Sequence, residues 1–494
     1  MTFFRFKKHK ISRGKIIFLI ILLIFTTSGI VGLYHNMKPS PTATNKAGSI
    51  HYLTEEEIEF LYDLTYTKNN NRILEQQIFR EVLEMIDNAE NYILLDFFLF
   101  NRDGDDQSEE YVDLVGKITN RLITKKEKDP EINIYLITDP INNFYGSYRS
   151  KHLKKLEKAG IEVIITDLTK LRDSNPIYSG FWRSYIQWFD TKGSGWISHP
   201  FDNQKNQITL RSALKVLNFK ANHRKILMSD DDDQMVSLIT SANPHNASSL
   251  HSNIAFKITG PIWQDIFITE QAVANFSNSE ITSPNIPKQE NNQNKDRNIT
   301  AKILTEKKIK EHLIKDLEKT NEQDEIMMTM FYLSHRDVIE SLINASDRGV
   351  EIKIILDPNK DAFGREKTGI PNRQVAYELN KRSNGNIKIR WYDTKGEQFH
   401  SKMTLIQKQE KIITHGGSAN LTRRNLDGFN LETNVKITTP LNTKLAKELT
   451  SYFERIWNNT DGKFTLKLTD TYYDPSLLKY WLYRFQEFSG ISSF

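Results

Sequence analysis

The pattern of hydrophobic and polar positions divides the chain into one long apolar run and a body of short alternating segments. The run covers residues 16–34, nineteen positions without a charged side chain, which is long enough to cross a bilayer as one helix. Small and turn-forming residues fill positions 37–50, and almost no large apolar residue occurs in positions 283–298. We interpret the first of these stretches as a stalk and the second as a linker between two halves of the body.

The two halves of the body repeat one order of predicted elements. In each half a β-rich run ends in an Asp-Pro pair, and a helix-like stretch and a second β-rich run follow it. The first half contributes residues 131–136, Asp139-Pro140, 151–159 and 161–166, and the second contributes residues 351–356, Asp357-Pro358, 372–381 and 387–392. Strands and helices that alternate in this way predict α/β layers.

We therefore predict an α/β fold of two similar lobes, each a mixed β-sheet flanked by helices, related by a pseudo-two-fold axis and preceded by one N-terminal transmembrane helix. The 494 residues of the chain are enough for two such lobes. The expected divisions are a basic cytoplasmic tail (1–15), the transmembrane helix as a signal anchor (16–34), a stalk and lead-in (35–70), lobe 1 (71–282) with an aromatic insertion (170–215), a linker (283–300), lobe 2 (301–460) and a C-terminal extension (461–494).

The charges beside the apolar run predict its orientation. Six of the first fifteen residues are Lys or Arg, and no acidic residue occurs before Glu55. Because basic flanks stay in the cytoplasm, we expect a single-pass protein of the cell membrane with a cytoplasmic N-terminus and an extracytoplasmic body. A cleaved signal peptide with its apolar core at residues 16–25 is the alternative, although no A-x-A site follows it. Both interpretations place the body outside the cytosol.

The basic tail also changes the meaning of the net charge. The whole chain has 67 Lys and Arg against 62 Asp and Glu, whereas the residues after position 15 have 61 against 62. The body is therefore close to neutral, and its overall charge does not favour a nucleic acid as ligand. The absence of cysteine excludes disulfides, thiolate metal sites and a cysteine nucleophile.

Each half carries a His-x-Lys motif and, further on, a Ser-Ala-Asn triplet. These residues are His223, Lys225, Asp230, Ser241 and Asn243 in the first half and His400, Lys402, Gln407, Ser418 and Asn420 in the second. An acid follows the first lysine by five positions, whereas glutamine takes its place in the second half, and twenty positions separate histidine from asparagine in both. One His-x-Lys pair is uninformative, because such pairs are common on surfaces. Two copies at one offset within a duplicated framework indicate a shared site.

The side chains of these motifs suit a phosphoryl group. If the motifs lie on strands, histidine and lysine point to the same face, because side chains alternate along a strand. Two lysines and two asparagines would then stabilise oxygens whose negative charge grows in the transition state. A neutral histidine can attack phosphorus, and a second histidine can protonate the leaving oxygen. We expect no cofactor and no metal, since no cluster of carboxylates is evident in the sequence.

The paired motifs resemble those of the phospholipase D superfamily, in which HxKxxxxD occurs twice in one active site and a Gly/Ser-x-Asn element follows. The similarity covers residues 75–460, and the string 222–226 is similar to that of bacterial cardiolipin synthases. The resemblance implies a two-step reaction through a phosphohistidine, with water or an alcohol as the acceptor. It assigns the attack to His223 and the role of acid, then base, to His400.

The resemblance also implies the roles of the remaining residues. Lys225 and Lys402 would hold the phosphate, and Glu432 would match the acid that orients a catalytic imidazole. Alignment of residues 257–259 with 436–438 puts Asn253 opposite Glu432, so each half has kept one of two expected acids. The predicted catalytic residues are His223, Lys225, Asp230, His400, Lys402 and Glu432, and the predicted phosphate-binding residues are Asn243, Asn420, Ser241 and Ser418.

Residues 176–201 form an insertion that is rich in aromatic side chains and poor in charge. The helical spacing of four side chains predicts one aromatic stripe, formed by Trp182, Tyr185, Trp188 and Phe189. With Trp196, the tryptophans are candidates for contact with the membrane interface or an acyl chain. A core-packed subdomain and a surface that stacks the bases of single-stranded nucleic acid are the alternatives.

These observations together predict a membrane-anchored phosphodiesterase or phosphatidyltransferase that acts on phospholipids through a phosphohistidine. The expected partners are a phospholipid membrane and a phospholipid substrate, and no obligate protein partner is evident. An exported single-strand nuclease of the same superfamily is the alternative enzyme. An inactive, phosphate-binding homologue is the alternative without catalysis.

Overall fold

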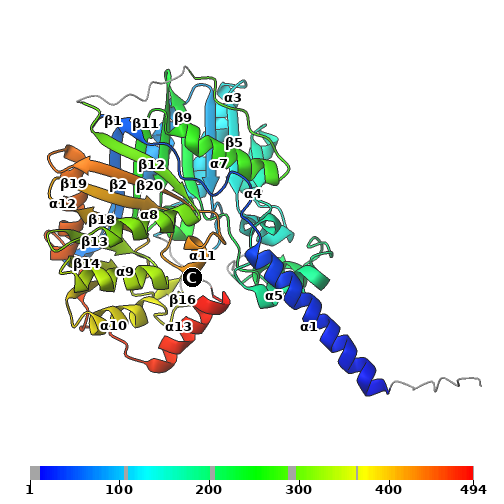
Figure 1. Cartoon of the computed structure of the whole chain (residues 1–494). Helices are drawn as coiled ribbons and strands as arrows, with labels where there is room; N and C mark the ends of the chain where they lie inside the picture. Colours follow the sequence, from blue (N-terminus) through cyan, green and yellow to red (C-terminus); the bar gives the residue numbers. More distant parts are fainter. Residues whose placement is uncertain (1–11, 105–109, 201–205, 287–295, 363–364, 493–494) are drawn as a thin grey trace, which may run out of the picture.

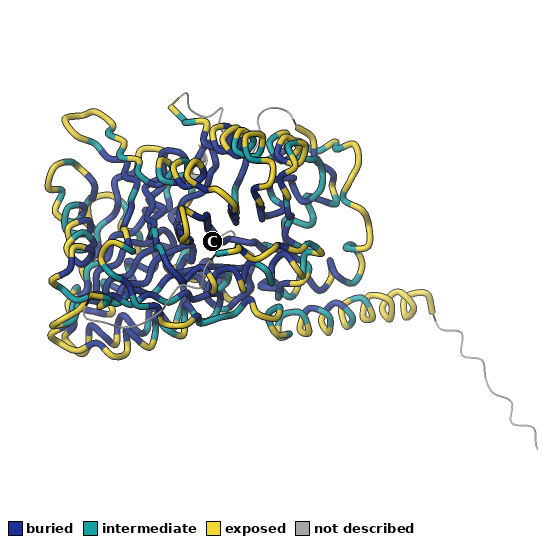
Figure 2. The backbone as a smooth tube through the Cα atoms, turned by 90° about the horizontal axis from the view of Figure 1, so that it is seen from above, coloured by how far each residue is buried: buried dark blue, intermediate teal, exposed yellow. Residues whose placement is uncertain are grey.

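The computed structural model describes residues 12–104, 110–200, 206–286, 296–362 and 365–492 (Figure 1). The apolar run forms helix α1 (Arg13–Met37), whose 25 residues are long and apolar enough to cross a membrane, as those of a signal sequence would also be. Figure 2 shows that the N-terminal part of α1 extends away from the body as an exposed helix, while Ser28 and Gly32 nearer its other end are buried. Most of the predicted basic tail and half of the predicted linker lie outside the described residues.

The described strands form two large sheets and two small hairpins. The first sheet contains β2 (Ile58–Lys68), β3 (Asn71–Gln76), β4 (Tyr92–Phe97), β5 (Asn133–Thr138), β6 (Glu162–Ile165), β9 (Lys225–Asp231), β10 (Gln234–Thr240) and β11 (Asn253–Thr259). The second contains β1 (His51–Leu53), β12 (Ile299–Thr305), β13 (Glu325–Met330), β14 (Glu351–Leu356), β17 (Ile387–Tyr392), β18 (Lys402–Gln407), β19 (Lys411–Gly417), β20 (Thr433–Pro440) and β21 (Thr465–Lys467). The hairpins are β7 (Ile197–Ser198) with β8 (Gln207–Ile208) and β15 (Asp361–Ala362) with β16 (Arg365–Glu366).

The two large sheets share one strand order. Six consecutive strands run β11-β10-β9-β4-β5-β6 in the first sheet and β20-β19-β18-β13-β14-β17 in the second. In both, the strand that begins at a motif lysine is antiparallel to its neighbour β4 or β13, which is in turn parallel to β5 or β14. The predicted α/β fold with mixed sheets is confirmed, and so is the repeat. The two-fold relation between the halves stays a prediction.

The sheets pack on each other through a shared core. Ile254 and Phe256 of β11 belong to one hydrophobic cluster with Met403 and Leu405 of β18. The approach is close at Gly416, where a Cβ would come within 2.7 Å of the Phe256 ring. Glycine is therefore the residue that lets β19 lie against the first sheet.

Helices cover the outer faces of both sheets (Figure 1). Apolar positions three and four apart give them one buried stripe, as in α2, where Ile78, Val82, Met85 and Ile86 are buried. The outer face of the first sheet is covered by α2 (Ile78–Asn88), α3 (Leu114–Lys128) and α4 (Lys151–Lys158), and that of the second by α8 (Lys307–Glu318), α9 (Arg336–Asp347) and α10 (Asn372–Arg382). The other helices are α5 (Pro176–Phe181), α6 (Leu210–Val216), α7 (Trp263–Phe276), α11 (Arg423–Leu426), α12 (Lys444–Asn458) and α13 (Leu477–Ser489).

Two predicted domain boundaries, the start of lobe 1 and the end of lobe 2, differ from those in the structure. Strands β1 and β2 lie inside the predicted stalk and lead-in, yet β1 pairs with β12 and β2 pairs with β11. The alternation of buried Ile58 and Phe60 with exposed Glu59 explains why this segment forms a strand. At the other end, β21 and α13 belong to the second half, because β21 pairs with β17 and Tyr483 of α13 is fully buried.

Candidate active site

Both motif histidines lie just before a strand, in segments where one half of the chain contacts the other. The backbone N–H of His223 donates to Leu431 O at 2.9 Å, and that of His400 donates to Ser252 O at 2.8 Å. The sequence pattern predicts that histidine and lysine share a strand, but the strands β9 and β18 begin at the lysines. Each histidine is thus held by the half to which it does not belong.

The two Asp-Pro pairs fix the residues that precede the histidines. Asp139 Oδ2 accepts from the backbone N–H of Asn222 at 2.8 Å, and Asp357 Oδ2 accepts from that of Phe399 at 2.8 Å. Burial raises the pKa of each carboxyl to about 7. The sequence showed this pair as part of the repeat, and the structure gives it a positioning role.

The side chain of each motif lysine donates to the backbone oxygen of the histidine two residues before it. Lys225 Nζ donates to His223 O at 2.7 Å, and Lys402 Nζ donates to His400 O at 2.9 Å. Both ammonium groups are buried, which lowers the pKa of Lys225 to about 7 and the pKa of Lys402 well below its ordinary value. A bound anion would raise both pKa values and favour the charged ammonium groups, because opposite charge stabilises the protonated form.

Two phenylalanines pack against these groups and were not predicted. The Phe98 ring lies 4.9 Å from the His223 ring, and the Phe331 ring lies 4.8 Å from the His400 ring. The ammonium of each half's motif lysine lies over the same ring, 5.4 Å from Phe98 and 5.3 Å from Phe331. Each phenylalanine directly follows β4 or β13, so a full alignment of the two repeats would have found them.

His223 has a carboxylate partner. Its Nδ1 lies 2.8 Å from Glu432 Oε1, and the side chains of Ser418 and Asn425 donate to the same carboxylate. Burial pushes the pKa of Glu432 upward, but the interaction with His223, the charge of Lys225 and the hydrogen bond from Ser418 hold it below its ordinary value overall. Burial also lowers the pKa of His223 to about 4. This arrangement pairs a neutral imidazole with an ionised carboxylate and leaves Nε2 as the reactive nitrogen.

His400 has an amide partner instead. Its Nδ1 lies 3.1 Å from Asn253 Oδ1, and Ser241 Oγ donates to the same oxygen at 3.1 Å. Burial and then the charge of Lys402 lower the pKa of His400 well below its ordinary value. A neighbouring histidine, His251, lies 5.8 Å away between ring centres and was also missed by the sequence analysis.

The predicted phosphate-binding residues separate into two groups. Ser241 and Ser418 hold the partners of the histidines, so the structure gives them a positioning role rather than the predicted contact with phosphate. Asn243 Oδ1 accepts from the backbone of Leu99 at 3.2 Å, which leaves its amide protons available. Asn420 is buried, and its Oδ1 has no hydrogen-bond partner among the described residues. The two asparagines therefore remain candidate donors to a phosphoryl oxygen.

Asp230 does not belong to this cluster, which corrects its predicted catalytic role. Its carboxylate accepts from the backbone N–H groups of Glu90, Asn91 and Tyr92 at 2.8 to 3.2 Å. It lies five residues along β9 from Lys225, about 17 Å at the rise of an extended strand. The acid of this motif holds the start of β4.

The predicted aromatic stripe of the insertion is also corrected. Trp182 is buried, whereas Trp188 and Trp196 are about three-quarters exposed. The cause is a π-helical turn at residues 182–186, in which Gln187 N donates to Trp182 O. Five residues close this turn instead of four, so Trp182 and Trp188 leave the common face that α-helical spacing predicts.

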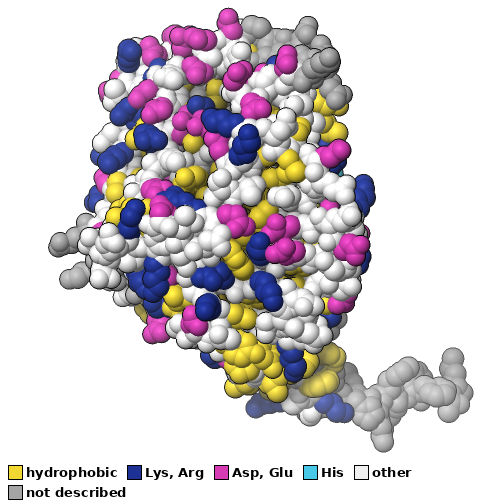
Figure 3. Space-filling view, turned by 90° about the vertical axis from the view of Figure 1, so that its left-hand side faces the viewer, with side chains coloured by type: hydrophobic (Ala, Val, Ile, Leu, Met, Phe, Trp, Pro, Cys, Tyr) yellow, Lys and Arg dark blue, Asp and Glu magenta, His cyan; other side chains and the backbone are white. Residues whose placement is uncertain are grey.

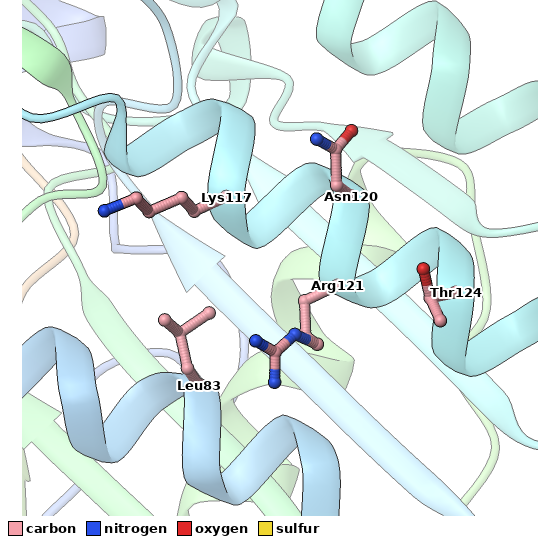
Figure 4. A pocket seen from close by; sticks show the side chains of 5 residues that line it. All are labelled: Leu83, Lys117, Asn120, Arg121 and Thr124. Carbon is pink, nitrogen blue, oxygen red and sulfur yellow. The ribbon is translucent and has the colours of Figure 1, made fainter.

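Other described features do not compete with this site. No group of three or more His, Asp and Glu that could hold a metal occurs among the described residues. A surface pocket between α2 and α3 is lined by Leu83, Lys117, Asn120, Arg121 and Thr124 (Figure 4). It contains none of the motif residues and no pair of groups suited to acid–base chemistry.

Comparisons with known proteins agree with this geometry. The family model described as cardiolipin synthase, PLD-like domain, matches residues 313–457. None of the curated proteins compared with this chain matches it in sequence. The crystal structure of phosphatidylserine synthase from Haemophilus influenzae Rd KW20 is similar, with a TM-score of 0.57, 12% identity and coverage of 91% of this chain and 96% of that chain.

Two further solved structures are similar at lower scores. Polyphosphate kinase from Porphyromonas gingivalis has a TM-score of 0.46 and 12% identity over 87% of this chain and 52% of that chain. The phospholipase D family member Nuc from Salmonella typhimurium has a TM-score of 0.26 and 19% identity over 33% of this chain and 97% of that chain. These two scores are too low to carry an argument. The family model matches part of the second half, and the similarity to the synthase shows a shared fold. Both findings agree with the resemblance to the phospholipase D superfamily that the paired motifs carry.

Proposed function

We propose that this protein is a membrane-anchored phosphodiesterase or phosphatidyltransferase that acts on phospholipids through a phosphohistidine. One observation carries the proposal. The backbone N–H of each motif histidine is hydrogen-bonded by the opposite half, and its backbone oxygen accepts from the motif lysine of its own half. The superfamily fold supports this type of chemistry in the broad sense. The apolar helix α1 supports the anchor and, with it, a lipid substrate.

In the first step of the proposed reaction, Nε2 of His223 attacks phosphorus and the bond from phosphorus to the leaving oxygen breaks. His400 donates its proton to that oxygen, which departs as an alcohol. The positive charge that forms on the His223 ring is stabilised by Glu432, 2.8 Å from Nδ1. The product is a phosphohistidine on His223.

In the second step, His400 takes a proton from water or from an alcohol, whose oxygen then attacks phosphorus. The bond from phosphorus to Nε2 of His223 breaks, and both histidines return to their first state. Lys225 and Lys402 would hold the charge of the phosphoryl oxygens throughout. Water yields a phosphatidic acid, and an alcohol yields a new phosphodiester.

The full chain in detergent, given phosphatidylglycerol vesicles and, separately, single-stranded DNA, tests this proposal. We expect lipid products, identified by mass spectrometry, and an acid-labile phosphorylated histidine when the reaction is quenched early. The matched control is the His400→Ala variant, which should form no free alcohol. Release of nucleotides without any lipid product would contradict the proposal and support the nuclease alternative.

A further inference from the structure

Helix α13 presents an apolar face to the outside of the molecule. Its exposed large side chains are Leu477, Leu478, Trp481, Leu482, Phe485 and Phe488. At 100° per residue, these positions fall within an arc of about 140° on the helix. Leu478 is 81% exposed and Phe488 is 83% exposed. A folded protein rarely leaves so many large apolar groups together in water, so this outer face of α13 needs a partner.

The opposite face of α13 packs on the second half of the chain. Tyr483 is fully buried, and Glu487 Oε1 accepts from the backbone N–H of Arg423 at 2.6 Å and from Ser334 Oγ at 2.9 Å. Arg423 begins α11, three residues after Asn420. The contacts on the docked face therefore orient α13, and they leave its apolar side outward.

The end of α13 meets the end of α1 on the same short segment. Asp173 N donates to His35 O at 3.0 Å, and Asn36 Nδ2 donates to Asp173 O at 2.7 Å. On the other side of this segment, Gly490 packs so closely on Ser174 O that a Cβ would collide with it. The C-terminal end of α13 thus lies beside the point where α1 enters the body.

Part of the body also contacts α1 within its apolar run. A Cβ on Gly180 of α5 would collide with Ser28 O, and a Cβ on Gly32 would collide with Pro176 O. Ser28 is twelve residues after Ile16, which is about 18 Å along a helix whose bilayer has a core of about 30 Å. If α1 spans from residue 16, α5 reaches the outer half of the bilayer, where the exposed side chain of Ile177 would meet lipid.

The figures agree with a common membrane surface. In Figure 1, α13 runs across the direction of α1 rather than along it. Hydrophobic side chains gather at the lower end of the molecule in Figure 3, the end where α13 and α1 lie. A helix in this position, with an apolar face outward, suits the boundary between headgroups and acyl chains.

We propose that α13 is an interfacial helix that lies on the bilayer crossed by α1 and inserts its outer face into the outer leaflet. The inference rests on the membrane anchor of the proposed function. It also specifies the substrate: a phospholipid in the same leaflet, which reaches the site at headgroup level. Because Glu487 holds the start of α11, the helix couples membrane contact to the position of the active-site loop.

Spin labels measure this contact directly, since the chain has no cysteine of its own. Leu478→Cys and Phe488→Cys, labelled with a nitroxide in the full chain in lipid nanodiscs, should be accessible to oxygen and shielded from a water-soluble nickel complex. The matched control is Lys444→Cys on α12, a side chain that is 75% exposed, which should show the reverse. Labels on α13 that are as accessible to nickel as the control, or shielded from both reagents as in a protein interface, would overturn the proposal.

A second measurement separates this inference from the proposed function. The double variant Leu478→Ser with Phe488→Ser should lower turnover of phosphatidylglycerol in bilayers by at least about fivefold, because α13 no longer holds the active site at the bilayer surface. Hydrolysis of a short-chain, water-soluble phosphodiester should not change. Equal loss on both substrates would contradict a docking role. The depth of the labels does not depend on turnover. The labels can therefore show that α13 lies outside the bilayer while the protein still turns over phospholipid, and they can show that α13 is inserted although no phospholipid is turned over.

Discussion

The two motif histidines have matched surroundings that differ in one respect. Both are hydrogen-bonded by the opposite half, both face a phenylalanine, and both have a buried lysine at their backbone oxygen. The difference is the partner of Nδ1, which is the carboxylate of Glu432 for His223 and the amide of Asn253 for His400. Opposite charge stabilises a protonated imidazole and an amide does so much less. The duplicated site is therefore chemically unequal.

This inequality suits a division of labour. In the proposed reaction, the ring that bonds to phosphorus becomes positively charged and keeps that charge through the lifetime of the intermediate, so a fixed carboxylate stabilises this ring most. The other ring only passes a proton in each step. A bound phosphodiester would itself raise the pKa of His400, because its negative charge would oppose the effect of the Lys402 charge on the ring.

The largest expected effect comes from removing either ring. His223→Ala and His400→Ala should each lower kcat by at least about 10³-fold, because one variant loses the nucleophile and the other loses the acid. Steady-state turnover of a soluble phosphodiester measures this. Only His400→Ala should still accept phosphorus on His223 from a substrate with a good leaving group. Phosphohistidine in the His223→Ala variant would reverse the assignment.

Exchanging the two partners tests the inequality itself. Glu432→Gln should lower kcat by about 10- to 100-fold, as expected when the group that orients a reactive imidazole loses its charge. Asn253→Asp should act differently, since a carboxylate beside His400 raises the pKa of that ring by about 1–3 units. His400 must be protonated in the first step, and that form disappears as pH rises through its pKa. The high-pH limb of the kcat profile should therefore move upward.

The matched control for this exchange is Asn253→Ala, which removes the amide without adding charge. It should reduce kcat and leave the high-pH limb in place. A limb that stays fixed in Asn253→Asp as well would show that His400 is not the titrating acid.

The sequence predicted the repeat well because its signals are local. Residues 351–356 and 387–392 coincide with β14 and β17, and the helix expected at 372–381 is α10 with one further residue. Apolar alternation and Asp-Pro pairs act within a few positions, so they survive without knowledge of the tertiary structure. The two histidines and lysines were found by the same repeated spacing.

What the sequence could not provide depends on packing between distant segments. The partner of each histidine comes from the other half, and alignment alone could not tell which imidazole Glu432 meets. Trp182 is buried because of a π-helical turn, which no residue type in the sequence predicts. The sequence analysis took residues 461–494 only as a C-terminal extension, and the docked Tyr483 is what shows which side of α13 faces outward.

The halves also differ at the last motif position, which is Asp230 in the first half and Gln407 in the second, and we expect this difference to affect stability. Asp230→Ala should lower the free energy of unfolding by about 1–3 kcal/mol, because one buried and two partly buried backbone N–H groups lose their acceptor. Gln407→Ala should change it by less than about 0.5 kcal/mol. In the second half a different acid, Asp324, accepts from Asn321 N and from Lys408 Nζ near the start of β13. Thermal unfolding in detergent compares the two variants, and kcat per folded molecule should be unchanged in both.

The smallest expected effect is that of chelation, and it tests what both halves supply together. Lys225 and Lys402 bring two cations to the site, and the described residues contain no cluster of three or more His, Asp and Glu for a divalent ion. The nucleophile and the acid are also side chains, so no step of the proposed reaction needs a metal-bound water. Turnover of the soluble phosphodiester should therefore stay within experimental error in excess EDTA. A loss that magnesium, calcium or zinc restores would contradict the proposed mechanism. An unchanged rate in EDTA with a large loss in Lys225→Met or Lys402→Met would assign the stabilisation of phosphoryl charge to the two lysines, one from each half.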